Sequence, residues 1–226
     1  NEIKIIEDCA QAIGAKFNDR YLGTISDIGV MSFDHGKMIA CGEGGMVLTN
    51  RKDYADFVSQ YSDHGHENNP KFSRGEDTKT IAGFNYRMTE LQAVIGKEQA
   101  RRINYILKEN KRRYPILNKN LSKHFELREI PKNSTSNYDT FIFYVKKNEK
   151  EKILKSIKNS KFGTKNLPDA IKWHCSYYWD HVFNKKEIQS SKKTLNLLKT
   201  SIAIPILLKK SLKDYEILVK NILKAK

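Results

Sequence analysis

Short apolar segments alternate with glycine-rich turns in the first fifty residues, and this alternation limits the possible folds more than any other feature. Residues 3–6 are mostly β-branched and are followed by acidic residues that include Asp8. Two further apolar runs occupy residues 30–33 and 46–49. Buried strands joined by short turns are typical of an open α/β sheet, whose ligands bind at the carboxyl ends of the strands. We therefore expect Asp8 to end a buried strand near a ligand site.

A modest helix and a long polar segment follow these strands. Residues 53–61 carry aromatic and aliphatic side chains on one helical face. Residues 63–83 are polar and lack a regular hydrophobic period. Because such long segments are uncommon inside compact domains unless they are functional, we expect a functional loop or a lid here.

A helical hydrophobic period runs from about residue 88 to about residue 123. Thr89 and Gln92 have the spacing of a capping box at its start, and Pro115 predicts a break within it. We expect this long helix to connect two lobes rather than to form a coiled coil.

The last hundred residues shift in composition toward Lys, Asn and Ile, and their predicted elements are shorter. Strands are expected at 125–130, 140–145 and 202–206, and helices at 149–159 and after Ser211. The expected organisation is therefore part of a large α/β domain in residues 1–87, a linking helix in residues 88–123 and a small α+β domain in residues 124–226.

The composition excludes several classes of protein. With 39% hydrophobic residues among 226, the chain can bury a core. It has no apolar run of about 18 residues and no signal-peptide pattern, so we expect no membrane association and no export. Cys9, Cys41 and Cys175 are widely spaced and form no metal-ligand pattern, so we expect no metal, no disulfide and a cytoplasmic location.

The net charge of +15 raises the question of nucleic-acid binding. The lysines are spread through the second half of the chain among Asn and Ile, without the clustered basic footprint of such proteins. Solvated helix faces explain this spread more simply, so we expect no nucleic-acid partner.

Asp8 and Lys37 are the first candidates for chemistry, and each has an ordinary explanation too. A carboxylate at the end of a buried strand is costly unless it meets a cation or hydrogen-bond donors, although Asp8 could also be a helix N-cap. Lys37 is a single lysine among small and apolar residues, and by itself such a lysine is more often a surface residue than a nucleophile.

Four ordered sequence blocks favour the chemical roles of Asp8 and Lys37 over the ordinary ones. They resemble, in order and spacing, the motifs of the DegT/StrS family of nucleotide-sugar aminotransferases, which are pyridoxal-phosphate enzymes. The blocks are residues 7–12 (EDCAQA), 29–37 (GVMSFDHGK), 42–47 (GEGGMV) and 83–88 (GFNYRM). The resemblance runs through the whole chain and implies an α/β fold of the aspartate-aminotransferase type (fold type I).

The resemblance implies roles for three residues near the cofactor ring. Lys37 stands at the position of the Schiff-base lysine, which also moves protons as acid and base. Asp8 matches the carboxylate that keeps the pyridinium nitrogen protonated, and Gln11 matches an amide near the phenolic oxygen. Without the resemblance, Gln11 is equally well explained as an exposed amide.

Two further residues match positions near the cofactor phosphate. Ser32 matches a hydroxyl donor, and Asn85 matches a residue that reaches the phosphate in the neighbouring subunit, which implies a homodimer with a shared site. A strand-end cap and a turn former are the simpler explanations for Ser32 and Asn85. Arg87 either joins an ion pair or orients a substrate carboxylate.

Five basic side chains suggest a particular substrate. Together with their neighbours they resemble the branch of the family that aminates 8-oxo-3,8-dideoxy-manno-octulosonate for lipopolysaccharide, with glutamate as the donor. Charge-assisted hydrogen bonds would suit the carboxylate of such a sugar acid, although half of these residues could be solvated loop. The five are His64, His66, Arg74, Lys165 and His174.

Two alternatives remain open. One is an aminotransferase for a nucleotide-linked 4-keto-6-deoxy hexose, and the other is a non-catalytic regulatory protein on the same fold. In the family, a further N-terminal segment carries the phosphate-binding turn and an aromatic ring that stacks on the cofactor. We therefore expect this chain to be a C-terminal portion of the enzyme that binds the cofactor weakly by itself.

Overall fold

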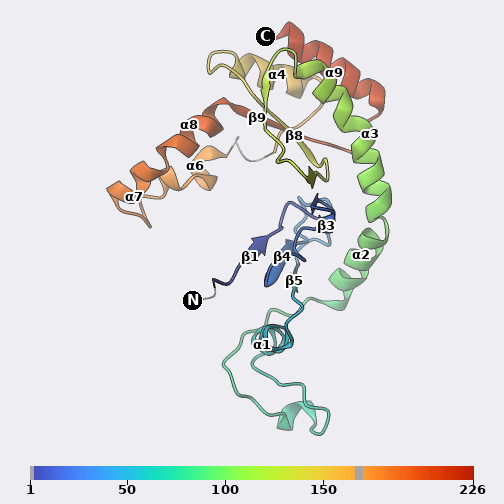
Figure 1. Ribbon diagram of the computed structural model, residues 1–226, viewed down its shortest axis with the longest axis vertical. Coiled ribbons are helices and arrows are strands. Elements are labelled where there is room, and N and C mark those ends of the chain that lie inside the picture. The colour runs from blue at the N-terminus through green and yellow to red at the C-terminus, as the bar shows by residue number, and fades with distance from the viewer. Residues whose placement is uncertain (1–2, 166–169) are drawn as a thin grey trace. The chain divides into compact units, whose positions relative to one another are not determined.

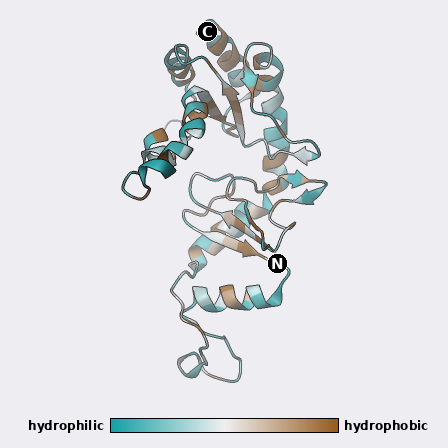
Figure 2. Cartoon of the chain, turned by 60° about the vertical axis from the view of Figure 1, so that its left-hand side comes forward, coloured by the Kyte–Doolittle hydropathy of each residue, from teal (hydrophilic) through white to brown (hydrophobic). Residues whose placement is uncertain are grey.

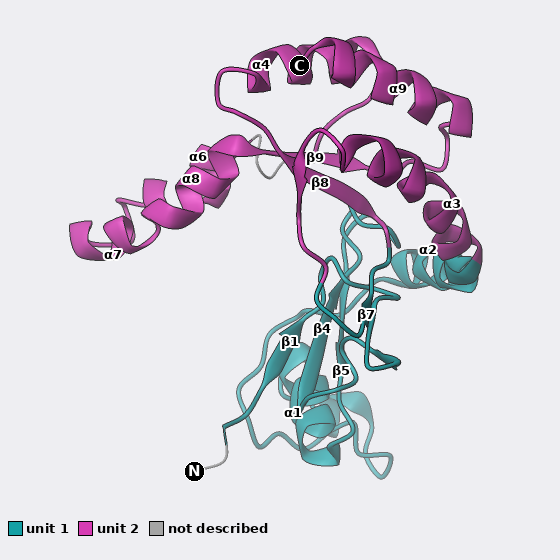
Figure 3. Cartoon of the chain, turned by 45° about the horizontal axis from the view of Figure 1, so that its top comes forward, with its two compact units in different colours: residues 1–104, 131–137 teal, residues 105–130, 138–226 magenta. Residues whose placement is uncertain are grey.

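The computed structural model describes residues 3–165 and 170–226, which form two compact units. Unit 1 comprises residues up to 104 together with 131–137, and unit 2 comprises residues 105–130 and 138–226 (Figure 3). Residues 166–169, part of the segment expected to face the sugar, lie outside the described residues.

The first sheet of unit 1 has the strand order β1-β4-β5, with β1 at Ile6–Asp8, β4 at Ile28–Ser32 and β5 at Gly45–Leu48 (Figure 1). Strand β1 pairs in parallel with β4, and β5 pairs antiparallel with β4. The three predicted strands are confirmed, although the first lies three residues later than expected. The expectation of a buried first strand is wrong, because β1 lies at the edge of this sheet and Ile6 is 64% exposed.

A second small sheet of unit 1 joins distant parts of the chain. Its order is β3-β2-β7, with β2 at Lys16–Phe17, β3 at Arg20–Tyr21 and β7 at Ser134–Thr135. The pairing of β2 with β7 places residues 131–137 in unit 1. Two-residue strands have no measurable period, so the sequence did not indicate them.

Helices complete unit 1. Helix α1 spans Lys52–Ser62, the short 3-10 helix η1 spans Arg74–Glu76, and α2 spans Glu90–Arg101. The predicted capping box is confirmed, since the Thr89 hydroxyl accepts the Gln92 N–H while the Gln92 side chain accepts the N–H of Thr89.

The predicted long helix is divided at a different residue than expected. Helix α2 ends before Arg102, and α3 then runs from Ile103 to Leu121 without a break at Pro115. The expectation of a break at Pro115 is therefore wrong. Leu117 and Leu121 are fully buried beyond the proline, and this packing offsets the hydrogen bond that the proline removes.

Unit 2 is an antiparallel sheet with helices packed against it. The order is β6-β8-β9, with β6 at Glu126–Leu127, β8 at Thr140–Tyr144 and β9 at Ser201–Pro205. Apolar residues dominate the two longer strands, β8 and β9, and strands coloured as hydrophobic are visible in this unit in Figure 2. The core includes Phe141 and Phe143 of β8, which are fully buried.

The helices of unit 2 agree with the predictions where the hydrophobic period is regular. Helix α4 spans Lys150–Asn159 and α9 spans Leu212–Lys224, with Ser211 as the N-cap of α9. Both bury aliphatic side chains in the core. Shorter elements that the sequence did not indicate are α6 at Ile171–His174, η2 at Ser176–Tyr178, α7 at Lys185–Ser190 and α8 at Lys192–Thr200. No helix within the described ranges combines the length and apolar character needed to cross a bilayer.

Candidate active site

The two carboxylates that end β1 have different partners. Glu7 accepts the backbone N–H groups of Gly23, Ile25 and Ser26 at 2.7, 2.8 and 2.7 Å. Burial raises the pKa of Glu7, but these hydrogen bonds lower it by more than burial raises it. The pKa of Glu7 therefore lies below its ordinary value. Glu7 therefore holds the turn that precedes β4.

Asp8 is exposed at the end of β1, and its carboxylate accepts the N–H of Ala10 at 3.1 Å. Neighbouring residues of a strand point to opposite faces, so Asp8 faces away from the turn that Glu7 holds. It is thus the carboxylate of this pair that is placed to meet a ligand at the strand end.

Ser32 and Lys37 follow the carboxyl end of the neighbouring strand β4. Because β1 and β4 are parallel, with Asp8 opposite Val30, the carboxyl ends of both strands meet at one edge of the sheet. Ser32 is the last residue of β4, and Lys37 lies in the connection to β5. The structure therefore brings Asp8, Ser32 and Lys37 to the same edge.

The connection that carries Lys37 is fixed by backbone hydrogen bonds. Phe33 N–H donates to the carbonyl of Gly44 at 2.8 Å, and Cys41 N–H donates to the carbonyl of Phe33 at 3.0 Å. Lys37 N–H closes a turn on the carbonyl of Asp34 at 3.0 Å. Lys37 is half-buried there, while the side chains of Phe33 and Cys41 are buried.

A small polar cluster precedes the lysine. The Asp34 carboxylate accepts the N–H of Gly36 at 2.8 Å and lies 2.9 Å from Nδ1 of His35. The hydrogen bond from Gly36 is the main reason that the pKa of Asp34 lies below its ordinary value. Ligand atoms of Asp34, His35 and Glu43 lie within 4.8 Å of one another, but exposed acidic groups are common without an ion, and we assign no metal to them.

Gln11 lies in the turn that follows β1, and its side chain is exposed. This turn is closed by the N–H of Ala12, which donates to the carbonyl of Cys9 at 2.9 Å. Cys9 N–H in turn donates to the carbonyl of Val30 in β4 at 2.9 Å, which ties the start of the turn to the sheet. Gln11 therefore lies three residues beyond Asp8 on a segment with defined backbone geometry.

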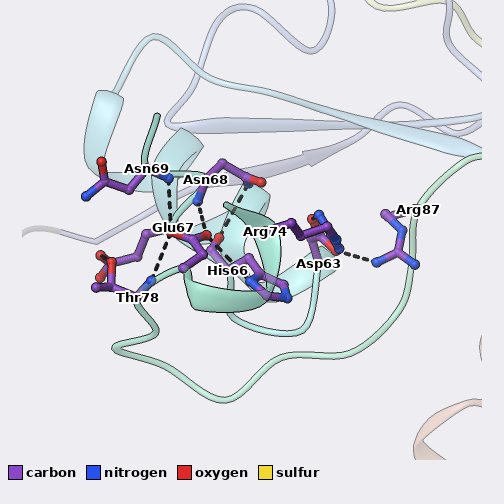
Figure 4. Close-up of polar contacts among 9 residues, drawn as sticks. Asp63, His66, Glu67, Asn68, Asn69, Arg74, Thr78 and Arg87 are labelled. Atoms are coloured by element: carbon purple, nitrogen blue, oxygen red, sulfur yellow. Dashed lines mark hydrogen bonds and ion pairs between the residues drawn. The ribbon is translucent and has the colours of Figure 1, made fainter. Parts of the chain in front are cut away.

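The polar segment at residues 63–83, expected to be a functional loop or a lid, is ordered around a buried carboxylate, Asp63, which is 8% exposed (Figure 4). Arg74 donates to both of its oxygens, at 2.9 and 2.5 Å, and Arg87 donates to Oδ1 as well. Hydrogen bonding from Arg74, reinforced by Arg87, holds the pKa of Asp63 far below its usual range. Arg74, expected to bind a substrate carboxylate, thus pairs with a carboxylate of the chain itself.

A second carboxylate, Asp77, organises the outer part of this segment. It accepts the backbone N–H groups of Asn68, Asn69 and Thr78 at 2.8, 3.1 and 2.9 Å. Burial raises the pKa of Asp77, but these hydrogen bonds and the nearby His66 together lower it by more than burial raises it. The pKa of Asp77 is therefore below its ordinary value. Nδ1 of His66 lies 3.5 Å from Oδ2 of Asp77, and the His66 ring packs edge-on against His64.

Asn85 lies on the strand-like segment that closes the loop. Asp63 and Asn85 form an antiparallel bridge, His64 N–H donates to the carbonyl of Phe84 at 3.0 Å, and Tyr86 N–H donates to the carbonyl of Ser62 at 2.9 Å. The Asn85 side chain is exposed and accepts the N–H of Arg87 at 3.3 Å.

The two remaining candidates for substrate binding belong to unit 2. Nζ of Lys165 lies 3.2 Å from Oδ2 of Asp139, and its backbone N–H donates to the carbonyl of Ala203 at 2.9 Å. His174 ends the short helix α6 and is exposed. His64, His66 and Arg74 belong to unit 1.

Sequence reasoning missed the carboxylates that position these segments. Asp63 and Asp77 occur in a polar stretch where nothing in the local pattern separates a buried anion from a solvated one. The available signal was limited to Arg74 within the stretch and Arg87 just after it, because a buried carboxylate needs cations or N–H donors.

Comparison with known proteins identifies the family. The model of the DegT/DnrJ/EryC1/StrS aminotransferase family matches residues 1–222, nearly the whole chain. The chain belongs to this family. The family resemblance inferred from the four sequence blocks is therefore confirmed.

Curated relatives of this family member include sugar-modifying enzymes. The chain is 33% identical over 137 residues to GDP-perosamine synthase of Escherichia coli O157:H7, an alignment that covers 61% of this chain and 35% of the relative. It is 24% identical over 221 residues to a UDP-4-amino-4,6-dideoxy-N-acetyl-beta-L-altrosamine transaminase of Campylobacter jejuni, covering 94% of this chain and 56% of that protein.

Solved structures confirm the expected fold. The aminotransferase TlmJ from Streptoalloteichus hindustanus superimposes with a TM-score of 0.81 at 19% identity, covering 99% of this chain and 58% of TlmJ. The sugar aminotransferase Spr1654 from Streptococcus pneumoniae, in its PMP-form, gives 0.82 at 18% identity, covering 99% of this chain and 59% of Spr1654. The chain thus spans less than two thirds of the length of these relatives.

Proposed function

We propose that this family member is a pyridoxal-phosphate-dependent aminotransferase that acts on a keto sugar. The observation that carries the proposal is the placement of Asp8, Ser32 and Lys37 at one edge of the β1–β4 pair. A phosphorylated pyridine aldehyde needs a carboxylate to accept the proton of its ring nitrogen, a hydroxyl to donate to its phosphate and an amine to react with its aldehyde. Glu7 is occupied by three backbone N–H groups, so Asp8 remains for the ring nitrogen.

The proposed chemistry divides between the cofactor and the chain. Pyridoxal phosphate, when bound, supplies an aldehyde for the amine and a ring that withdraws electrons from the reacting carbon. The Asp8 carboxylate would hold the proton of the ring nitrogen, and the Ser32 hydroxyl would donate to the phosphate. Lys37 Nζ, as a neutral amine, would take a proton from the substrate carbon and return it.

Gln11 and Asn85 have supporting roles in the same proposal. The Gln11 amide would hydrogen-bond near the phenolic oxygen of the ring. Asn85, presented on the ordered segment opposite Asp63, would reach the phosphate of a second subunit, so the functional unit would be a homodimer. Both assignments rest on the match of these residues to the family motifs.

A nucleotide-linked keto sugar is the substrate class that we favour, and glutamate is the proposed amino donor. The relatives reported above are named for GDP-linked and UDP-linked amino sugars. The octulosonate acid considered from the sequence depends on cations to bind its carboxylate. Arg74 lies against Asp63, and Lys165 lies against Asp139, which weakens that alternative.

A direct assay tests the proposal. The intact protein is supplied with pyridoxal phosphate and glutamate, and with either a GDP-linked 4-keto-6-deoxyhexose, a UDP-linked one or the 8-oxo octulosonate acid. Mass spectrometry should show the amino sugar from a nucleotide-linked substrate and 2-oxoglutarate in equal amount. Amination of the octulosonate acid alone would reverse the substrate assignment. No amination of any of the three, with no cofactor bound, would overturn the function.

A further inference from the structure

Asn137 makes an unusual long-range contact with the turn that carries Gln11. Its side chain is buried, at 7% exposure. Nδ2 donates to the carbonyl oxygen of Gln11 at 3.1 Å and to that of Ile13 at 3.2 Å, although these residues are more than 120 positions apart in sequence. All of these residues belong to unit 1.

Two further contacts hold the segment of Asn137 against the same part of unit 1. Strand β7 pairs with β2, with Lys16 opposite Thr135. Beyond β2, Asn18 N–H donates to the carbonyl of Asn133 at 2.9 Å. These contacts fix the backbone of residues 133–137. The amide of Asn137 is therefore held at a defined place beside the turn.

The chemistry of the contact requires an amide. One carboxamide nitrogen carries two N–H donors, which satisfy two carbonyl oxygens at once. Aspartate, which has the same shape, would present only acceptors to these carbonyls when ionised. Alanine would leave both carbonyls without this donor, and the loss of two partly buried hydrogen bonds is costly.

The turn held by Asn137 follows directly from the candidate ring-binding residue. Asp8 ends β1, Cys9 N–H is tied to β4, and Gln11 and Ile13 present their carbonyls to Asn137. The turn is therefore fixed at its start by the sheet and at its end by Asn137. We propose that Asn137 is a positioning residue that sets the place of Gln11 beside Asp8 and thereby the ring-binding end of the cofactor site. This inference rests on the proposed function.

The first measurement needs no cofactor. Hydrogen exchange at the N–H groups of Ala12 and Ala15, which close successive turns of this segment at 2.9 Å, is compared in the intact wild-type protein and in Asn137→Ala. We expect exchange roughly tenfold faster in the variant, which is the effect of losing one buried hydrogen bond. Thr135→Ala, an exposed change in the same segment, is the matched control and should leave exchange unchanged. If Asn137→Ala does not fold, Asn137→Ser replaces it, since serine retains one donor.

The second measurement tests the link to the cofactor. The Kd of pyridoxal phosphate is measured in the intact protein for wild type, Asn137→Ala, Gln11→Ala and the double variant. If Asn137 acts through Gln11, Asn137→Ala should weaken binding roughly tenfold in the wild-type background and much less in the Gln11→Ala background. Unchanged exchange, or equal losses in both backgrounds, would overturn the inference. A wild-type protein that binds no pyridoxal phosphate would overturn the proposed function and this role together, whereas normal binding with additive losses would overturn this role alone.

Discussion

The carboxylate of Asp63 accepts two parallel hydrogen bonds from the guanidinium of Arg74, at 2.9 and 2.5 Å. Two-pronged pairing of this kind fixes orientation as well as distance. Arg74 lies near the middle of the polar segment, and Arg87 joins the same carboxylate from the far side. One buried anion thus ties the start, the middle and the end of the segment together.

Removing this anion should loosen the segment without unfolding the protein. In Asp63→Ala, Arg74 and Arg87 lose their shared partner, so the N–H groups of His64, Phe84 and Tyr86 should exchange roughly tenfold faster. Asp53→Ala, which removes the exposed partner of Arg51, is the control for loss of a carboxylate. Equal protection in Asp63→Ala and wild type would show that the backbone bridge alone holds the segment.

The same carboxylate predicts a pH dependence with a definite sign. Its pKa in the folded protein lies far below the unfolded value of about 3.9, mainly because of Arg74. A lowered pKa gives stability that is complete above the unfolded value and is lost as the pH falls toward the folded one. Urea unfolding of wild type and Asp63→Asn should therefore differ most above about pH 5, and the difference should shrink progressively as the pH falls below about 4 toward the folded pKa. A difference that grows in acid would contradict this assignment.

Regular hydrophobic periods explain which parts of the fold the sequence predicted. Helices α4 and α9 and strand β8 each bury one face, and all were expected within a few residues of their observed bounds. Helix α1 and strand β9 were also expected, although α1 has no buried residue and β9 is buried along nearly all of its length. The break expected at Pro115 does not occur, because the burial of Leu117 and Leu121 overrides the local effect of the proline. Long-range packing decided that outcome, and the sequence pattern does not contain it.

The candidate site divides in the same way. Asp8, Ser32 and Lys37 could be named from the sequence because the blocks that contain them resemble the family motifs, whereas the strand and turn pattern alone left each with an ordinary explanation. Residues that hold the site through distant contacts could not, since Asn137 meets Gln11 across more than 120 residues. The contact depends on the pairing of β2 with β7, whose two-residue strands carry no signal.

The backbone at the end of the polar segment, at Gly83, lies very close to the backbone at its start, near Tyr61 and Gly65. A substitution at Gly83 tests this close contact. A β-carbon added at Gly83 would lie 2.4 Å from the nitrogen of Gly65 and 2.8 Å from the carbonyl oxygen of Tyr61. Gly83→Ala should therefore cost about 1–3 kcal/mol of unfolding free energy through forced backbone movement. Gly75→Ala, in the same segment, meets nothing within 4 Å and should be nearly neutral. Urea denaturation measures the unfolding free energy of both variants. Equal losses would contradict the close contact of Gly83 with residues 61–65.

The core of unit 2 contains a tyrosine, Tyr215, whose hydroxyl forms a hydrogen bond with the backbone. Tyr215 is fully buried, and its hydroxyl accepts the backbone N–H of Leu207 at 2.7 Å. Tyr215→Phe keeps the ring but leaves that N–H without this acceptor, so we expect a loss of about 1–3 kcal/mol in unfolding free energy. Tyr86→Phe, at a 67% exposed position, is the control. A neutral Tyr215→Phe would indicate that water replaces the hydroxyl.

Lys37 carries the most direct prediction of the proposed function. Its amine is the group that would attack the cofactor aldehyde and then move the proton, so Lys37→Ala should lower amino transfer from glutamate by roughly 10²–10⁴-fold or more. Borohydride treatment of the protein with pyridoxal phosphate should attach the cofactor to the peptide that contains Lys37.

Lys52→Ala is the matched control, because Lys52 is an exposed lysine paired with Asp56 on α1, and it should retain full activity. Lys37→His is a sharper variant, since imidazole keeps a basic nitrogen but has no primary amine to attack the aldehyde, and it too should lose amino transfer. Labelling of Lys4, Lys16 or Lys52 in place of Lys37, or undiminished turnover by Lys37→His, would show that the reacting amine lies elsewhere in the protein.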